Sequence, residues 1–244
     1  MQIFRTALFA LTGAALSACQ PVSDNDDRAE SLRAFPRPDR AVSDASSTEF
    51  STEAARDEAG EATKLMNWAD IQPGTTVADI GAGEGYYTVR LSQRVGLKGR
   101  VLAQDINRDA LDRLGERVVR ERLLDNVAIK EGGFDDPRLP PGSFDRIFMV
   151  HMYHEIAEPY AFLWRMRPAL ATGGQVIVVD RDRPTNQHGI PPKLLFCEFA
   201  SVGYQLKEFV ERPEVSAYFA RFELSGERPK PEAIKACKAN ALAG

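Results

Sequence analysis

The sequence predicts an α/β fold: a three-layer sandwich around a mostly parallel, seven-stranded sheet that ends in a C-terminal antiparallel hairpin. Three observations lead to this prediction. Short apolar strands alternate with helical segments from residue 75 onward, which favours parallel strands covered by helices on both faces. A glycine-rich turn at residues 81–85 joins the first of these strands to a helix. Two segments of alternating polarity, 204–210 and 215–222, come last and can pair as a hairpin.

The composition is that of an ordinary globular protein. Its 244 residues are 43% hydrophobic and 27% charged, which leaves room for one α/β domain plus a tail. The formal net charge of -4 gives no electrostatic reason to bind a polyanion. We therefore expect a small-molecule partner and no nucleic acid.

The first 19 residues have the pattern of a signal peptide. Arg5 precedes an apolar, small-residue run at 6–18 that is too short to span a bilayer. The run ends in Leu-Ser-Ala-Cys19, which resembles the bacterial lipobox, whose cysteine becomes the lipid-bearing N-terminus after cleavage. The alternative, a buried N-terminal helix, has no amphipathic periodicity to support it. We expect an exported lipoprotein anchored to a membrane at Cys19. If the host has two membranes, Gln20 favours the periplasmic face of the outer membrane.

Three further segments follow the signal peptide. Residues 20–50 are rich in Asp, Ser, Arg and Pro, and they cannot bury enough apolar surface to offset their ordering entropy. They are predicted to form a flexible tether, although 35–40 can still lie along the domain. The catalytic domain is expected at 51–225, and a C-terminal tail at 226–244.

Two cysteines remain once Cys19 is assigned to the lipid. An exported protein can join Cys197 to Cys237, so a disulfide between them stays open. Cys197, however, ends an apolar stretch at 194–197, where a free buried thiol is the favoured interpretation.

The expected elements are placed by periodicity and by turn residues. Apolar residues recur every three or four positions from Ala55 to Ala69, which predicts one helix that Pro73 and Gly74 terminate. Asn107 can cap a later helix, and Pro168 should distort another. The remaining strands are expected at 75–80, 100–105, 127–130, 144–150 and 175–180, and the helices at 86–95, after 107, at 157–170 and at 191–202.

The glycine-rich turn predicts a nucleotide-like cofactor. Glycines let the backbone turn sharply and approach a ligand, and the following helix offers unpaired N–H groups. The fingerprint for NAD needs a third glycine at position 86, where this chain has Tyr86. The second strand ends at Asp105, 20 residues after Gly85, where a carboxylate can accept hydrogen bonds from ribose hydroxyls.

These residues resemble the first motif of the class I, Rossmann-like S-adenosylmethionine-dependent methyltransferases, an acidic residue followed by Gly-x-Gly-x-Gly. More narrowly, the chain is similar to exported bacterial predicted methyltransferases. The resemblance implies S-adenosylmethionine as the cofactor, with its methionine end near Asp79 and its ribose at Asp105. The cofactor-binding residues that it implies around the turn are Asp79, Gly81, Gly83, Gly85, Tyr87 and Asp105.

The resemblance extends through 131–136, 139–145 and 167–174, with one departure. Many relatives carry Gly-Asp after the third strand to bind the adenine amino group, whereas this chain has Gly132-Gly133. Packing on Phe134, together with Asp135 or Asp136, is expected to serve instead.

The catalytic residues are expected directly after the fourth strand, in His151-Met-Tyr153-His154-Glu155. This segment lies at the carboxyl edge of the sheet, where open α/β sheets bind their substrates. His154, or else His151, can accept a proton from the acceptor, and Tyr153 can line the pocket. The two histidines can instead share a metal with Glu155 or His188. No metal is predicted, because the chain has only three histidines and no cysteine motif.

The function predicted from these residues is methyl transfer to an oxygen, nitrogen or carbon centre of a small molecule. Alignment of the acceptor with the sulfonium methyl can supply most of the catalysis, so a conspicuous nucleophile is not required. One alternative is a non-catalytic lipoprotein that retains the fold, since an exported protein must still meet a cytoplasmic cofactor. A second is an NAD-dependent oxidoreductase, which Tyr86 disfavours. The loop 180–183 can bind a polar substrate or be a solvated surface loop.

Overall fold

The computed structural model describes residues 26–43, 52–123 and 125–238. The chain divides into two compact units, residues 1–33 and 34–244. The described part of the first unit contains one 3-10 turn, Glu30–Leu32, and an ion pair between Arg28 and Asp26. The predicted signal peptide, its Cys19 and both ends of the predicted tether, residues 20–25 and 44–50, lie outside the described residues.

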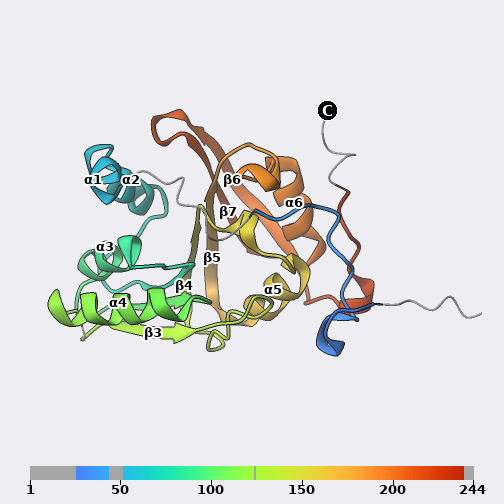
Figure 1. Ribbon diagram of the computed structural model, residues 1–244, viewed down its shortest axis with the longest axis horizontal. Helices are drawn as coiled ribbons and strands as arrows, with labels where there is room; N and C mark the ends of the chain where they lie inside the picture. The colour runs from blue at the N-terminus through green and yellow to red at the C-terminus, as the bar shows by residue number, and fades with distance from the viewer. Residues whose placement is uncertain (1–25, 44–51, 124, 239–244) are drawn as a thin grey trace, which may run out of the picture. The chain divides into compact units, whose positions relative to one another are not determined.

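The second unit is built on a seven-stranded sheet with the order β3-β2-β1-β4-β5-β7-β6 (Figure 1). Five neighbouring strands are parallel, β7 is antiparallel to β5, and β6 is antiparallel to β7. The predicted fold class is confirmed. The strands are β1 (Thr76–Ile80), β2 (Arg100–Asp105), β3 (Val127–Glu131), β4 (Phe144–Val150), β5 (Leu170–Asp180), β6 (Tyr204–Arg212) and β7 (Ala217–Leu224).

Helices cover both faces of this sheet. Figure 1 shows α2 (Glu61–Trp68) and α3 (Tyr86–Val95) on one side of β4 and β5, with α5 (Pro159–Met166) and α6 (Pro192–Ser201) on the other. Leu65 and Leu91 pack with Phe219 in the core on the first side. Phe222, on the opposite face of β7, stacks on Phe199 of α6 with the ring centroids 4.0 Å apart. Successive side chains of β7 therefore point to opposite faces of the sheet and contribute to two apolar layers, one under α2 and α3 and the other under α6.

A further helix, α4 (Arg108–Arg120), packs beside α3. Its predicted cap is present, because the Asn107 side chain accepts a hydrogen bond from the Ala110 N–H at 3.1 Å. Leu111 and Leu114 are buried against Ala103 of β2. The cap and this apolar stripe orient the start of α4 toward the carboxyl edge of the sheet.

The helix predicted over 55–69 is two helices, which corrects the sequence-based expectation. The first, α1 (Glu53–Glu58), is separated from α2 by Gly60, whose φ of 64° is left-handed. Glycine adopts this conformation without a steric penalty, so the chain bends there while its apolar period continues. The bend lets α1 lie beside the site while α2 packs on the sheet.

The helix predicted over 157–170 is also shorter than expected. It ends at Met166, and a 3-10 turn that contains Pro168 leads directly into β5 at Leu170. The strand therefore starts five residues before the predicted residue 175 and includes the glycine pair. A Cβ on Gly174 would lie 2.6 Å from the Phe144 carbonyl oxygen, so the close approach of β4 requires glycine there.

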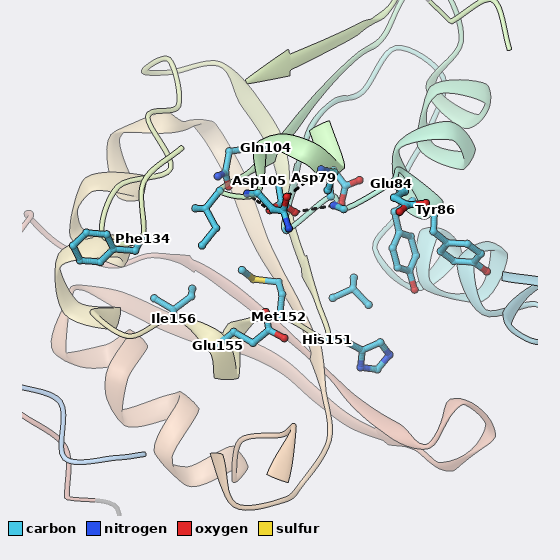
Figure 2. A pocket seen from close by; sticks show the side chains of 18 of the residues that line it. Asp79, Glu84, Tyr86, Gln104, Asp105, Phe134, His151, Met152, Glu155 and Ile156 are labelled. Atoms are coloured by element: carbon cyan, nitrogen blue, oxygen red, sulfur yellow. Dashed lines mark hydrogen bonds between the residues drawn. The ribbon is translucent and has the colours of Figure 1, made fainter. Parts of the chain in front are cut away.

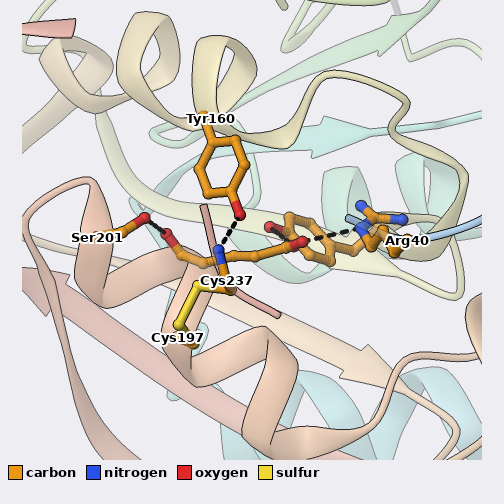
Figure 3. The surroundings of a disulfide bond; sticks show 7 residues. Arg40, Tyr160, Cys197, Ser201 and Cys237 are labelled. Atoms are coloured by element: carbon orange, nitrogen blue, oxygen red, sulfur yellow. Dashed lines mark hydrogen bonds and ion pairs between the residues drawn. A yellow bond between two sulfur atoms is a disulfide. The ribbon is translucent and has the colours of Figure 1, made fainter. Parts of the chain in front are cut away.

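The chain segments on either side of the predicted catalytic domain are attached to it. Cys197 of α6 forms a disulfide with Cys237, and the Cys237 N–H donates to the Tyr160 hydroxyl at 2.7 Å (Figure 3). The favoured interpretation of Cys197 as a free thiol is therefore wrong, because the predicted tail returns to α6. Asp39, from the predicted tether, forms a β-bridge with Lys238. Within the described residues, no helix combines the length and the apolarity needed to cross a membrane.

We predict that removing the disulfide destabilises the domain without unfolding it. The two cysteines are 40 residues apart, for which loop-closure entropy gives about 4 kcal/mol of stabilisation. A Cys197→Ala/Cys237→Ala double variant should lose about this much free energy of unfolding in a urea titration. Dithiothreitol should bring the wild type to the same level and leave the double variant unchanged. If dithiothreitol left the free energy of unfolding of the wild type unchanged, the prediction would be contradicted.

Candidate active site

A cavity of about 750 Å³ opens at the carboxyl ends of β1, β2 and β4 (Figure 2). The sheet order places it where the chain, after running outward from β1 through β2 to β3, returns to the other side of β1 as β4. Such a switch point is the usual ligand crevice of an open α/β sheet. The lining residues are Glu53, Arg56, Asp79, Gly81, Ala82, Gly83, Glu84, Tyr86, Tyr87, Gln104, Asp105, Ile106, Asn107, Ala110, Gly133, Phe134, Val150, His151, Met152, Glu155, Ile156, Ala157 and Phe162.

The three glycines of the turn have different roles. All three have positive φ, which L side chains rarely adopt. A Cβ on Gly81 would approach the Met152 side chain to 2.9 Å, and one on Gly85 would approach Leu114 of α4 to 2.3 Å. A Cβ on Gly83 would meet nothing within 4 Å. Gly83 thus leaves open space in the cavity, whereas Gly85 allows the turn to pack on α4 and is not part of the cavity wall.

Asp105 braces the glycine turn from the neighbouring strand. Its Oδ2 accepts a hydrogen bond from the Gly83 N–H at 2.8 Å, and its Oδ1 accepts one from the Asn107 N–H at 2.9 Å. The side chain also lines the cavity (Figure 2). One carboxylate therefore orients the turn, the start of α4 and the cavity wall together.

Asp79 is the most deeply buried carboxyl group in the cavity wall. Its Oδ2 accepts a hydrogen bond from the Thr88 hydroxyl at 2.7 Å. Burial, with a smaller contribution from the nearby charge of Asp105, raises the pKa of Asp79 to about 7, against the lowering effect of the Thr88 hydrogen bond. A cationic group in the cavity would favour the charged carboxylate, so the site is electrostatically suited to a positively charged ligand.

The far end of the cavity has two exposed apolar side chains. Phe134 and Ile106 are 53% and 52% exposed, and both line the cavity. Phe134 lies in a tight turn that is closed by the Gly133 N–H donating to the Asp136 carbonyl at 2.7 Å. Large apolar groups exposed beside a cavity suit a flat ring such as adenine.

Asp135 does not line the cavity, contrary to its predicted role. Its carboxylate accepts from Arg165 of α5, whose guanidinium also donates to the Asp135 carbonyl at 3.1 Å. This ion pair holds the turn that presents Phe134, so Asp135 positions the turn instead of facing a ligand. Gly132 matches the glycine of the relatives, and a Cβ there would lie 2.2 Å from the Gln104 side-chain nitrogen. The departure is Gly133, where a Cβ would come no closer than 3.4 Å to another residue, so packing does not require it.

His151 lines the other end of the cavity, directly after β4. It has a φ of 55° and is 8% exposed, and its Nε2 lies 3.8 Å from Glu61 Oε1. Burial lowers the pKa of His151 to about 4, despite the opposing effect of the Asp180 and Glu61 carboxylates. The imidazole is therefore neutral at physiological pH and has one unprotonated ring nitrogen, although the low pKa makes it a weaker base than a free histidine.

Arg56 and Glu61 support this end of the cavity from α1 and α2. The Arg56 guanidinium donates to Glu61 Oε1 at 2.7 Å, and the Tyr87 hydroxyl donates to the same oxygen at 2.6 Å. The Tyr86 ring has the Arg56 guanidinium carbon 3.8 Å and the Arg90 guanidinium carbon 3.9 Å from its centroid. Aromatic faces attract cations, so these contacts attach α1 to α3. Tyr87, a predicted cofactor residue, lines the cavity, but its hydroxyl is engaged with Glu61.

The structure does not bring Tyr153 and His154 to the cavity wall. Both residues are fully buried in the 3-10 turn Tyr153–Glu155. The Tyr153 hydroxyl donates to Glu198 Oε2 at 2.8 Å, and His154 Nδ1 lies 2.9 Å from Asp180 Oδ2. The sequence does not show which side chains of the loop after β4 face the cavity, because the left-handed φ of His151 changes the direction of the loop. Asp180 is fully buried and is no surface-loop residue.

Several lining residues escaped the sequence analysis. Ile106 and Gln104 flank the predicted Asp105, so their place at the same strand end could have predicted that they line the cavity. No feature of the sequence predicts this for Glu53 and Arg56, since only the bend at Gly60 brings α1 to the cavity.

Residues 77–174 match the family described as a methyltransferase domain. A curated relative, the ubiquinone/menaquinone biosynthesis C-methyltransferase UbiE of Shewanella oneidensis, is 30% identical over 124 residues. The match covers 50% of this chain and 48% of the relative. The chain thus spans about half the length of the curated relatives it matches.

Solved structures show the same architecture. A SAM-dependent methyltransferase from Aquifex aeolicus has a TM-score of 0.64 at 24% identity, over 69% of this chain and 92% of that chain. The fold is that of the class I methyltransferases. A TehB-like SAM-dependent methyltransferase from Corynebacterium glutamicum has a TM-score of 0.56 at 18% identity, over 70% of this chain and 94% of that chain. Within this methyltransferase fold, the family match includes the glycine turn, Asp105 and the segment after β4.

We predict that His151→Asn removes part of the acid sensitivity of the domain. Asparagine tolerates the left-handed φ but does not titrate. Unfolded His151 regains a pKa near 6.5, whereas the folded pKa is about 4, so protons favour unfolding as pH falls between these values. This histidine should cost the wild type about 2 kcal/mol of unfolding free energy between pH 7.5 and 5. The loss should be smaller by that amount in the variant.

Denaturant titrations at both pH values measure the difference. All other titrating groups are common to the two proteins, so each protein serves as its own control. Equal losses in wild type and variant would show that His151 is already protonated or exposed in the folded state.

Proposed function

We propose that this chain transfers a methyl group from S-adenosylmethionine to an oxygen, nitrogen or carbon centre of a small molecule. The observation that carries the proposal is the convergence of Asp79, the glycine turn and Asp105 on one wall of the cavity, with His151 at its opposite end. The cavity volume of about 750 Å³ is in the range of small-molecule sites. The family match and the methyltransferase fold support the reaction class.

The residues present fit the cofactor. Gly83 leaves open space in the wall, where a side chain would project, and Asp105 presents a carboxylate at the end of the second strand. We assign the ribose to Asp105, the adenine to the apolar surfaces of Ile106 and Phe134, and the cationic methionine end to Asp79. When bound, S-adenosylmethionine supplies an electrophilic methyl group on a positively charged sulfur.

The chain's own contribution is positioning and proton acceptance. We assign proton acceptance to His151 because its neutral imidazole lines the cavity, whereas His154 is enclosed and paired with Asp180. An acceptor hydroxyl or amine would give its proton to His151 as it gains the methyl group. The walls around it exclude water and align the reactants, which can supply most of the rate enhancement.

Binding and turnover test the proposal in two steps. The mature protein is first titrated with S-adenosylmethionine by calorimetry, and a metabolite mixture is then screened for incorporation of a labelled methyl group. We expect binding in the micromolar range and formation of S-adenosylhomocysteine with an active acceptor. Absence of binding at high micromolar cofactor would overturn the enzyme proposal and leave the non-catalytic lipoprotein, and tight NADH binding would favour an oxidoreductase.

We predict that Asp105→Ala weakens cofactor binding by about 1.5 to 3 kcal/mol, the range for loss of hydrogen bonds to a charged group. Part of this loss comes from the glycine turn, because the Gly83 N–H loses its acceptor. The fold should survive, since the carboxylate lies at the sheet edge. Asp112→Ala, at an exposed position of α4, is the charge-matched control. An unchanged dissociation constant in a folded Asp105→Ala protein would place the ribose elsewhere.

We also propose that the protein is exported and anchored by lipid at Cys19. The signal-peptide pattern of residues 1–19 supports this, and so does the Cys197–Cys237 disulfide, since such bonds persist in oxidising compartments. Cys19→Ala should give an unprocessed or soluble protein, whereas the wild type should fractionate with a membrane. Recovery of soluble wild type that still begins at Met1 would overturn the proposal.

A further inference from the structure

Three side chains capable of binding a metal meet beside the cavity, on two loops far apart in sequence. His154 and Glu155 lie in the turn after β4, and His188 follows β5. Their ligand atoms all lie within 4.8 Å of one another, with His154 Nε2 3.9 Å from Glu155 Oε1. The rings of His154 and His188 are nearly perpendicular, with centroids 5.7 Å apart. The cluster is therefore a product of tertiary folding and not of local sequence.

His154 directs an unsatisfied nitrogen into this cluster. Its Nδ1 lies 3.0 and 2.9 Å from the two oxygens of Asp180, and a carboxylate can only accept, so Nδ1 carries the hydrogen. The lone pair is then on Nε2, which is buried and has no hydrogen-bond partner among the residues that the structure describes. Buried polar atoms without a partner are rare in folded proteins, which indicates a missing ligand.

Asp180 has the role that a carboxylate commonly plays behind a metal-binding histidine. It is fully buried, and its Oδ1 also accepts from the Arg181 N–H at 2.8 Å, which fixes its orientation. A carboxylate behind the imidazole sets the tautomer and raises the basicity of the opposite nitrogen. The Asp180–His154 pair therefore prepares Nε2 to bind a cation.

One short chain segment, residues 40–43, holds both loops that carry the cluster. Arg40 donates to the His154 carbonyl at 3.1 Å and to the Ile156 carbonyl at 2.8 Å. Its Nε also donates to Glu198 of α6 at 2.9 Å, and Figure 3 shows Arg40 in the surroundings of the disulfide. The Ser43 hydroxyl donates to the Thr185 carbonyl and accepts from the His188 N–H. This segment holds the two loops in fixed positions relative to each other, as a preorganised site requires.

We propose that His154 Nε2, the Glu155 carboxylate and the His188 imidazole bind a divalent transition-metal ion of the zinc type. Two imidazoles and one carboxylate suit zinc, and three protein ligands leave one position of a tetrahedral centre for solvent. Bonds of about 2.1 Å place tetrahedral ligand atoms about 3.4 Å apart, so the 3.9 Å pair needs to contract only slightly. Because Glu155 also lines the cavity, the ion would adjoin the cavity to which methyl transfer is assigned. This reverses the sequence-based prediction of no metal.

The test is a zinc titration of the full chain with its disulfide intact. Protein stripped with a chelator is titrated with Zn²⁺ against a chromophoric competitor, and bound zinc is counted by elemental analysis. We expect one equivalent per chain. His188→Asn, which keeps the left-handed φ, should weaken binding by about 100-fold or more, and Asp180→Asn by about 10- to 100-fold. Glu155→Gln, on a partly exposed side chain, provides a ligand variant that should fold.

His151→Asn is the matched control. It removes an imidazole from the same loop, but that imidazole lies beside Glu61, so zinc affinity should not change. Circular dichroism of each metal-free variant confirms folding before titration. Less than one equivalent in the wild type, or equal affinities in all variants, would overturn the proposal. Neither result depends on S-adenosylmethionine, so failure here leaves the proposed methyl transfer untouched.

Discussion

The parallel pairing of β1 with β2 on one side and β4 on the other is the constraint on which the rest of this structure depends. It brings three strand ends to one edge of the sheet, although their residues are widely separated in sequence. Asp79, Asp105 and His151 reach a common cavity only because these strands are neighbours. The hydrogen bond from the Gly83 N–H to Asp105 then ties the turn after β1 to the end of β2.

The buried titratable groups near this edge of the sheet form two sets, one that lines the cavity and one that lies behind the loop after β4. Around the cavity, burial shifts Asp79 and His151 toward their neutral forms, with pKa values of about 7 and about 4. These groups can exchange protons or respond to a cation. Behind the post-β4 loop, Glu198 is held by Arg40 and Tyr153, although burial still raises the pKa of its carboxyl group. These hydrogen bonds orient the backbone of the loop after β4, and they occupy both carboxylate oxygens of Glu198.

Segments outside the matched methyltransferase stretch complete the domain. Residues 34–43 and the end of the described chain lie together through the bridge between Asp39 and Lys238. The first supplies Arg40, whose side chain is 1% exposed, and the second supplies Cys237 for the disulfide. Removing one member of a buried ion pair leaves an uncompensated charge, so these segments belong to the folded unit and its stability. They also hold the loops on which the proposed acceptor and metal sites depend.

The sequence by itself determined the alternation of strands and helices from β1 onward, the glycine turn and the acid at Asp105, because these depend on local periodicity, glycine conformation and strand ends. The boundaries of α3 and β2 could be read for the same reason. Only the tertiary structure decided which histidine faces the cavity, because the left-handed φ of His151 redirects the loop and encloses His154. The sequence left open both the Cys197–Cys237 disulfide and the grouping of His188 with His154 and Glu155, since each joins segments that meet only when the sheet and its returning ends are packed.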